Sequence, residues 1–514
     1  MQTSRGNWTL KRRLRSAILA LMIASVSVVA EAAVQAPAQA LPGYAARQDA
    51  LMAQYRAALA QVDDGAYDEA YSTLTKLIEA DDFELLSSDA RGDIFNLAAG
   101  IDFYHKHYVL AQRYIHLAEL NLPTDPVILR LAFKIESAQQ DVVAATAVFE
   151  RLDGDEAAKL GNSEIGQVFR AAKPEQMHRF LEALYRAQWK YPTGDEPSVY
   201  WLRLCYERVR VGDLDGAAEV ATKITNPKDR LVLQLDRRFQ PLKAASEDAK
   251  SLLATGETNL AVLRQRAEAQ PRSLDAINQI GAALVDLGRS EEALMLADQT
   301  VARLKAADSS PFDDVEQEKV WTLNLRSQAL LDVGRIDEAV QQLEDAIALT
   351  ERGYSNVSQV INLAQLYVHL GEADKAEAVI MQVGSTSDYG QAQVLYVSAY
   401  VALLRGDRER YLNVAADLEK LIEVAPRAWL SVQLRAGEND AVAARLVQWL
   451  GDPDPARVWR ALGLLAADTP AKPGLPATEQ QRAQLAAIRQ RPDIIKAVAK
   501  VGRLLTYPLP APLG

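Results

Sequence analysis

Four stretches of the chain share one pattern, and this internal repetition limits the possible fold more than any other feature of the sequence. Each stretch contains a helical run, a glycine, about four polar residues, an alanine and a second helical run; the four span residues 201–224, 277–301, 323–347 and 360–383. One such helix pair cannot bury its apolar face alone, so successive pairs must stack on one another. The sequence therefore predicts an all-α protein built from helix–turn–helix repeats.

Two small residues in each repeat have separate physical roles. A glycine tolerates the positive φ that ends a helix, and the four glycines are Gly212, Gly288, Gly334 and Gly371. The alanine that follows five residues later lets two helices approach to about 8–10 Å. Cys205 falls at the same crossing position on the first helix as Gly281 and Ala364. We therefore expect Cys205 to be a small buried residue and not a reactive thiol.

The pattern resembles the tetratricopeptide-repeat (TPR) family, whose unit of about 34 residues follows W-x2-L-G-x2-Y…A-x3-F…P. One copy is matched by Trp201, Leu204, Gly212 and Ala217, and another by Leu363, Ala364, Tyr367, Gly371 and Ala376. The resemblance covers most of residues 45–450 and is clearest in 275–385. It implies a right-handed superhelical solenoid of TPR-like helix-turn-helix repeats.

The composition agrees with packed helices and restricts the partners. Aromatic residues make up only 7% of the 514 residues, and a sheet core would use more of them. The net charge of -11 repels phosphate backbones, which argues against nucleic acid as a partner. The single cysteine can form neither an internal disulfide nor a cysteine metal site.

The first 32 residues have the three parts of a secretory signal peptide: basic residues from Arg5 to Arg15, an apolar run over 16–30, and small residues at Ala30 and Ala32. We expect cleavage after Ala32 and a periplasmic or secreted protein of a Gram-negative bacterium, with no stable membrane span left. The alternative is an uncleaved anchor, but a spanning helix needs roughly 18–20 apolar residues.

Breaks in the pattern divide the rest of the chain. Residues 33–44 form a flexible leader and 45–190 hold degenerate TPR-like repeats. The main array spans 198–450 and includes an irregular segment near 226–256. Residues 451–514 are expected to form capping helices and a proline-rich tail.

No catalytic motif is found in the sequence. It contains no glycine-rich phosphate loop, and its five histidines are not spaced to share one metal ion. Adjacent carboxylates, such as Asp313 and Asp314, fall at predicted helix ends, where capping explains them. We predict no catalytic residue, no metal and no cofactor.

The best candidate for a binding site is the groove that the first helix of each repeat lines in the TPR family. The matching positions carry amide and aromatic side chains: Asn278, Trp321, Asn324, Gln328, Gln365, Tyr396 and Tyr400. Amides can hydrogen-bond a peptide backbone or sugar hydroxyls, and exposed rings offer stacking area. The cationic clamp with which some relatives bind carboxylate-tailed peptides is missing. The alternative is that these residues form an ordinary solvated helix face.

Two functions follow from these features. The first is a periplasmic TPR-like scaffold or adaptor that binds a protein partner in cell-envelope or polysaccharide-handling machinery, with polysaccharide as the second kind of partner. The alternative is a helical-solenoid enzyme acting on polysaccharide, as a lyase, hydrolase or transglycosylase, whose acidic site has no recognisable spacing.

Overall fold

The structure is a computed structural model that describes residues 43–191, 194–242, 249–306, 311–349, 356–466 and 472–505. The predicted signal peptide, nearly all of the predicted leader and the last nine residues of the tail lie outside the described residues. Within these ranges every regular element is a helix, and the only β-type pairing is one isolated bridge between Asp236 and Gly502. The all-α prediction is confirmed.

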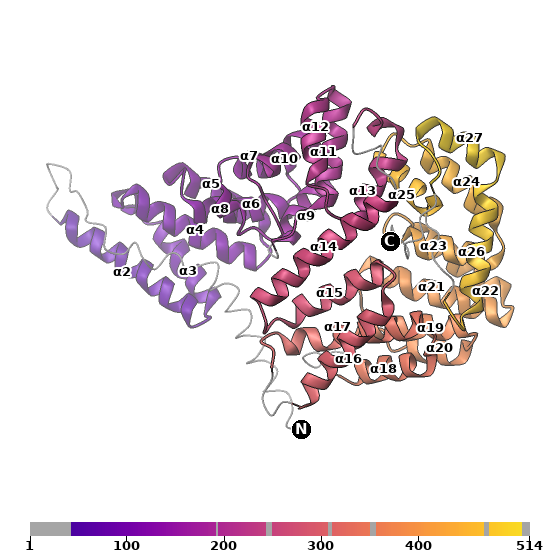
Figure 1. The fold of residues 1–514 in the computed structure, drawn as a ribbon. Coiled ribbons are helices and arrows are strands. Elements are labelled where there is room, and N and C mark those ends of the chain that lie inside the picture. Colours follow the sequence, from indigo (N-terminus) through magenta and orange to yellow (C-terminus); the bar gives the residue numbers. More distant parts are fainter. Residues whose placement is uncertain are drawn as a thin grey trace. The chain divides into compact units, whose positions relative to one another are not determined.

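The chain divides into two compact units, Met1–Leu204 and Cys205–Gly514. Antiparallel neighbours follow one another in the first unit, as Figure 1 shows. Its helices are α2 Tyr44–Asp63, α3 Tyr67–Ile78, η2 Phe83–Leu85, α4 Ser88–Tyr104, α5 Tyr108–Asn121, α6 Pro126–Ala138, α7 Val142–Phe149, α8 Gly154–Ala157, α9 Asn162–Ala171 and α10 Pro174–Arg186. Helix α11, Ser198–Val211, contains the boundary between the two units.

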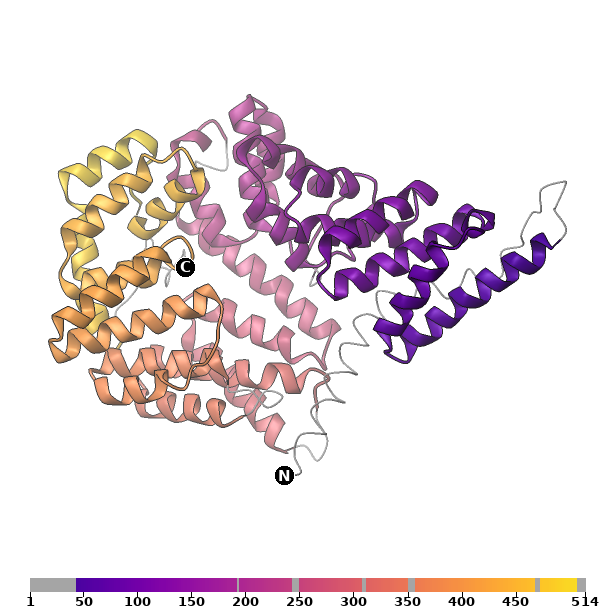
Figure 2. The same ribbon diagram turned by 180° about the vertical axis from the view of Figure 1, so that it is seen from behind.

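The second unit continues with helix pairs and ends in three further helices (Figure 2). Its paired helices are α12 Leu214–Thr222, α13 Pro227–Leu235, η3 Arg237–Phe239, α14 Ala249–Ala269, α15 Leu274–Asp286, α16 Ser290–Ala306, α17 Val315–Asp332, α18 Ile336–Ala348, α19 Val357–Leu370, α20 Ala373–Ile380, α21 Asp388–Arg405, α22 Arg408–Lys420, α23 Pro426–Ala436 and α24 Asn439–Leu450. The last three are α25 Pro455–Ala466, α26 Pro476–Arg489 and α27 Pro492–Val501. We call the first helix of each repeat its A helix and the second its B helix.

Left-handed residues join A and B helices, as predicted. Gly371 ends α19 with φ 82° and Gly406 ends α21 with φ 71°, so a side chain at either position would be strained. Lys106 takes the place of the glycine between α4 and α5, at φ 64°. Gln140 takes the same conformation between α6 and α7, at φ 60°.

The crossing position of the A helix is as tight as the sequence indicates. A Cβ added at Gly281 would overlap the side chain of Leu325, and Ala364 is fully buried. Cys205 is fully buried, and its Sγ lies 3.4 Å from the carbonyl oxygen of Ala217. Burial raises the pKa of the Cys205 thiol to about 12, so the expected packing role is confirmed.

The segment near 226–256, expected to be irregular, contains regular structure. Helix α13 begins at Pro227 and has Asn226 as its N-cap, while α14 begins at Ala249. The sequence reading missed α13 because this nine-residue helix lacks the glycine and alanine of the repeat. Its own buried side chains include Leu233 and Leu235.

The end of the chain packs back onto the second unit. Helix α25 contacts α13, and Trp459 donates a hydrogen bond of 2.7 Å from Nε1 to buried Asp236. Arg503 donates to the carbonyl of Gln234 at 2.6 Å. Helix α27 packs on α24, and α26 lies against α19, α23 and α24. The last helices therefore belong to the core of this unit.

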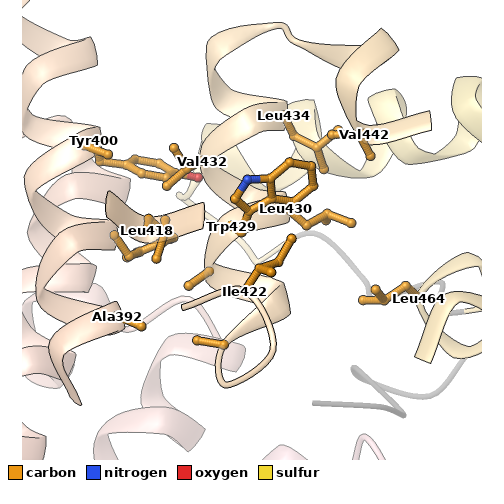
Figure 3. Close-up of a cluster of buried hydrophobic side chains, with 14 of the residues drawn as sticks. Ala392, Tyr400, Leu418, Ile422, Trp429, Leu430, Val432, Leu434, Val442 and Leu464 are labelled. Atoms are coloured by element: carbon orange, nitrogen blue, oxygen red, sulfur yellow. The ribbon is translucent and has the colours of Figure 1, made fainter. Parts of the chain in front are cut away.

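One large apolar cluster connects these elements. It extends from α13 through α19–α25 to α27 and includes Trp429, which is 3% exposed. Figure 3 shows Trp429 among Leu418, Val432 and Val442. Burial of such side chains is the main stabilising term of the unit, at about 25 cal/mol per Å² of apolar surface.

Candidate functional site

A cavity of about 350 Å³ lies between the A helices α17 and α19 of the second unit. Its wall is completed by the segment that leads into α26. Most of the lining residues are polar, and they include Asn324, Gln328, Asn362, Gln365, His369 and Lys472. We call this space the α17–α19 cavity. Three of the seven predicted groove residues, Asn324, Gln328 and Gln365, line it.

Amides on successive A helices are paired along this wall. Asn362 Nδ2 donates to Asn324 Oδ1 at 2.6 Å, and Gln365 Nε2 donates to Gln393 Oε1 at 2.7 Å. Each pair joins one A helix to the next. Because an amide has two donor hydrogens and two acceptor lone pairs, each side chain can still bind a ligand. Gln328 is exposed, and none of the described residues forms a hydrogen bond with its side chain.

Four predicted groove residues lie outside the cavity wall, and two of these are Trp321 and Asn278. Trp321, on α17, is 43% exposed. Asn278, on α15, is engaged with the next repeat, where its Nδ2 lies 3.2 Å from the Glu318 carboxylate and its Oδ1 accepts from Thr322 at 2.8 Å. Asn278 therefore fixes one repeat against the next.

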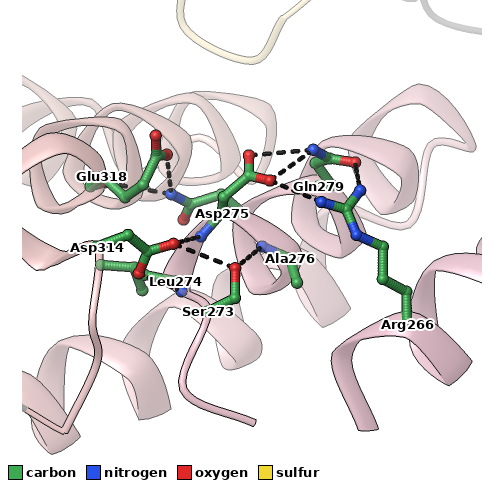
Figure 4. A network of polar contacts seen from close by, with 9 residues as sticks. Arg266, Ser273, Leu274, Asp275, Ala276, Gln279, Asp314 and Glu318 are labelled. Carbon is green, nitrogen blue, oxygen red and sulfur yellow. Dashed lines mark hydrogen bonds and ion pairs between the residues drawn. The ribbon is translucent and has the colours of Figure 1, made fainter. Parts of the chain in front are cut away.

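The same junction shows how adjacent acidic residues are used (Figure 4). Asp314 accepts from the backbone amides of Leu274 at 2.7 Å and Asp275 at 3.1 Å, so it caps α15 and not its own helix. Burial would raise the pKa of Asp314, but these bonds and the one from Ser273 outweigh it and lower the pKa. The expected capping role is therefore observed, across a repeat boundary.

Tyr396 and Tyr400 differ from the expectation of exposed rings. They are 6% and 0% exposed, and their ring centroids lie 4.7 Å apart. Tyr400 donates to the carbonyl of Ser431 at 3.3 Å and accepts from Gln481 of α26. Burial raises the pKa of Tyr400 to about 12. The two rings are buried because helix α26 covers this stretch of the A helices.

Polar contacts hold α26 and its leading segment in place. Gln484 Nε2 donates to the carbonyl of Leu434 at 2.8 Å, and Arg435 donates to Gln480 at 2.8 Å. Lys472 Nζ lies 2.8 Å from Asp332 Oδ1 at the end of α17. Helix α26 and its leading segment therefore cover the A helices from the α17–α18 turn onward. The α17–α19 cavity lies at the edge of this covered region.

His369 lies where the covered and open parts meet. Its Nε2 is 2.9 Å from the Tyr396 hydroxyl, and its buried Nδ1 has no hydrogen-bond partner among the described residues. Burial, together with the nearby positive charges of Lys472 and Arg435, lowers the pKa of His369 to about 4. The imidazole is thus neutral at pH 7, and no charge from it enters the cavity wall.

In the ranges that the structure describes, no group of three or more His, Cys, Asp or Glu side chains is placed to hold a metal ion. Among those same residues, none of the helices combines the length and the apolar character needed to cross a bilayer.

Three cavity residues were missed by the sequence reading. Asn362 follows Asn324 by 38 residues, close to the 37-residue step from Gly334 to Gly371, so an alignment of those two repeats could have found it. The sequence gives His369 no partner for a metal site and no other signal of its place in the wall. Lys472 lies after the end of the repeat pattern, and no periodic signal places it beside α17.

Comparison with known proteins bears on the repeats directly. Residues 320–356 match the model of a family described as tetratricopeptide repeat, and this stretch spans most of α17, all of α18 and one wall of the cavity. Residues 320–356 therefore form a tetratricopeptide repeat. The match covers one repeat, and the other TPR-like repeats are assigned from their helix pairs, turns and buried crossing residues.

Among solved structures, the crystal structure of the APC/C hetero-tetramer Cut9-Hcn1 is similar at 13% identity. The alignment covers 95% of each chain, with a TM-score of 0.29. No curated protein matches the chain. The TPR repeats make the protein a protein-interaction scaffold.

Proposed function

We propose that the protein is a periplasmic adaptor that binds a protein partner of the cell envelope at the α17–α19 cavity. The observation that carries the proposal is the set of amide side chains on two successive A helices around a cavity of about 350 Å³. A space of this volume accepts one or two side chains of a partner. The amides beside it offer hydrogen bonds to the partner's backbone.

The character of the wall favours a peptide segment. Leu331, Leu343 and Leu366 give the cavity an apolar floor, which a partner's side chain can fill. Among the described residues of the wall, Lys472 is the one cation, and it is already paired with Asp332. We therefore propose that the cavity binds a neutral stretch of a partner protein and not a free carboxylate.

The proposal that the protein is periplasmic rests on the N-terminal sequence alone. Basic residues, an apolar run and the small residues Ala30 and Ala32 support export and cleavage. Mass spectrometry of the mature N-terminus, together with fractionation of the native host, tests this part. A mature chain that begins at Ala33 in the periplasmic fraction supports it, and an intact N-terminus in the cytosol contradicts it.

The binding proposal is tested by cross-linked affinity capture from the native host with three forms of the full chain. The first is unchanged, the second carries Asn324→Ala and Gln328→Ala, and the third carries Met381→Ala, at a position 79% exposed and outside the cavity wall. We expect one envelope protein to be recovered with the first and third forms and to be depleted about tenfold with the second. Equal recovery with all three forms would contradict the cavity as the site. Binding of a purified envelope polysaccharide in place of a protein would favour the second kind of partner.

A further inference from the structure

The nine B helices that follow a left-handed turn residue divide into two classes. In seven of them the second residue is acidic: Asp68, Asp215, Glu291, Asp337, Asp374, Glu409 and Asp440. The turn residue before each of these seven helices is glycine. In α5 and α7 the second residue is Val109 and Val143, and the turn residues are Lys106 and Gln140. The two departures occur together, in two consecutive repeats of the first unit.

Both changes, valine in place of an acidic residue and lysine or glutamine in place of glycine, act against local stability. An acidic residue in the first turn of a helix interacts favourably with the positive end of the helix dipole, and valine does not. Glycine adopts a positive φ without strain, whereas lysine and glutamine do not. The two valines do not compensate by packing, because Val109 is 74% exposed and Val143 is 53% exposed. Folding alone gives no reason for this pair of changes.

A cavity lies at the same edge of the first unit. Its volume is about 350 Å³, and its wall includes Tyr108, Ser137, Gln140, Gln167 and Arg170. Tyr108 directly precedes Val109, and Gln140 is the turn residue that precedes α7. Neither valine lines the cavity, but each lies within three positions of a wall residue, and we call the two valines together with the cavity the valine edge.

Unpaired cations surround the valine edge. Lys106, Arg113 and Arg170 are exposed, and no hydrogen bond or ion pair joins any of them to a described residue. Arg113 lies one turn after Val109 on the same face of α5. The nearby carboxylate of Asp141 is occupied, since it accepts from the Ala144 amide at 3.0 Å as the N-cap of α7. This excess of positive charge occurs on a chain whose net charge is -11.

We infer that the valine edge is a second docking surface, and that its occupant is a segment of a partner protein that carries apolar side chains beside aspartate or glutamate. The valines supply apolar contact, the cavity accepts a side chain, and Arg170 can bind a carboxylate through two parallel hydrogen bonds. An anionic membrane also attracts exposed valine and lysine. A chain with a charge of -11 is repelled by such a membrane, and a flat bilayer would not fill the cavity.

The surface is tested with the full chain and a displayed library of random peptides, followed by affinity measurements on the enriched sequences. Four variants are compared: the double change Val109→Asp and Val143→Asp, the charge reversal Arg170→Glu, the cavity pair Asn324→Ala and Gln328→Ala in the second unit, and Met381→Asp as an exposed control. We expect enriched peptides in which Asp or Glu lies close to a large apolar residue. The first two variants should weaken their binding about tenfold or more, and the last two should leave it within about twofold.

Thermal unfolding separates this result from misfolding. Aspartate at the second helical position restores the residue type of the other seven B helices, so the double aspartate variant should unfold at the same temperature as the unchanged chain or at a higher one. Lost binding together with retained stability supports the inference. Enrichment of no peptide, enrichment of peptides without acidic residues, or equal binding by the Val109→Asp, Val143→Asp chain would overturn it. So would valine-dependent binding to anionic lipid vesicles.

Discussion

The A helices of the second unit present one stretch that the chain itself covers and one that it leaves open. Around α21 and α23, helix α26 lies over the ring of Tyr400 and bonds to the backbone of Leu434. Between α17 and α19, the corresponding surface keeps a cavity of about 350 Å³ lined by amides. The sequence shows polar and aromatic residues in both stretches. The difference teaches that repeat position alone does not make a binding surface, because another part of the chain can occupy it.

Removing helix α26, which covers the ring of Tyr400, should have the largest effect on the stability of the second unit. Deleting residues 467–514 exposes the surface around Tyr400 and removes the buried side chains of Leu475, Ile488, Ile494 and Val498. Each buried aliphatic side chain contributes about 1.5–3 kcal/mol, so we expect the free energy of unfolding of the second unit to fall by at least about 5 kcal/mol. Urea unfolding followed by tryptophan fluorescence measures this loss. Deleting only residues 506–514 is the control, and equal stability of the two truncated chains would contradict a structural role for α26.

A matched pair of substitutions compares the two stretches directly. Tyr400→Ala removes a fully buried ring and should cost about 3–5 kcal/mol. Trp321→Ala removes a larger ring that is 43% exposed and should cost less than about 1 kcal/mol. Chemical denaturation of both variants gives the comparison. If Trp321→Ala were the more damaging change, the assignment of covered and open stretches would be reversed.

The pH dependence of stability tests the boundary between the two stretches. The pKa of His369 is about 4 in the folded chain and about 6.5 when unfolded, so the unfolded chain binds the proton more readily. The stability that this residue contributes is complete above pH 6.5 and is lost as the pH falls toward 4. Between pH 7 and pH 5 we expect a loss of about 2 kcal/mol that is absent from His369→Gln. Identical pH profiles for the two chains would contradict the burial of this imidazole.

The smallest effect concerns the first unit, whose α5 and α7 lack the acidic start found in the B helices of the second. Val109→Asp should stabilise the chain by about 0.3–1 kcal/mol through the helix dipole. Differential scanning calorimetry at low and high salt measures the gain, which should shrink as salt screens the charge. Asp337→Val in the second unit is the reciprocal control and should lower stability by a similar amount. A loss of stability on Val109→Asp would show that this valine has a packing role.

Much of the repeat architecture could be predicted from the sequence, because its causes are local. The turn glycines need a positive φ, and the small residues at 205, 281 and 364 reflect close crossing of helices within a few tens of residues. The same reasoning placed Asn324, Gln328 and Gln365 on one wall. Each of these features repeats, so each copy supported the others.

The parts that were missed depend on contacts between distant residues. Gln481 and Tyr400 are 81 positions apart, and Trp459 and Asp236 are 223 apart. Neither contact leaves a periodic signal in the sequence. For this reason the rings of Tyr396 and Tyr400 were expected to be exposed, and Lys472 was not expected at the cavity.

The most direct test of the central claim is photo-cross-linking from inside the cavity in the native host. A photoreactive amino acid at Gln328, which is exposed in the open wall, should give one reproducible adduct with an envelope protein. The same group at Met381, which is 79% exposed and outside the wall, should give none. The account predicts that the Gln328 adduct disappears when Asn324→Ala is added. Adducts that are identical at both positions, or none at Gln328, would contradict the α17–α19 cavity as the place where this scaffold binds its partner.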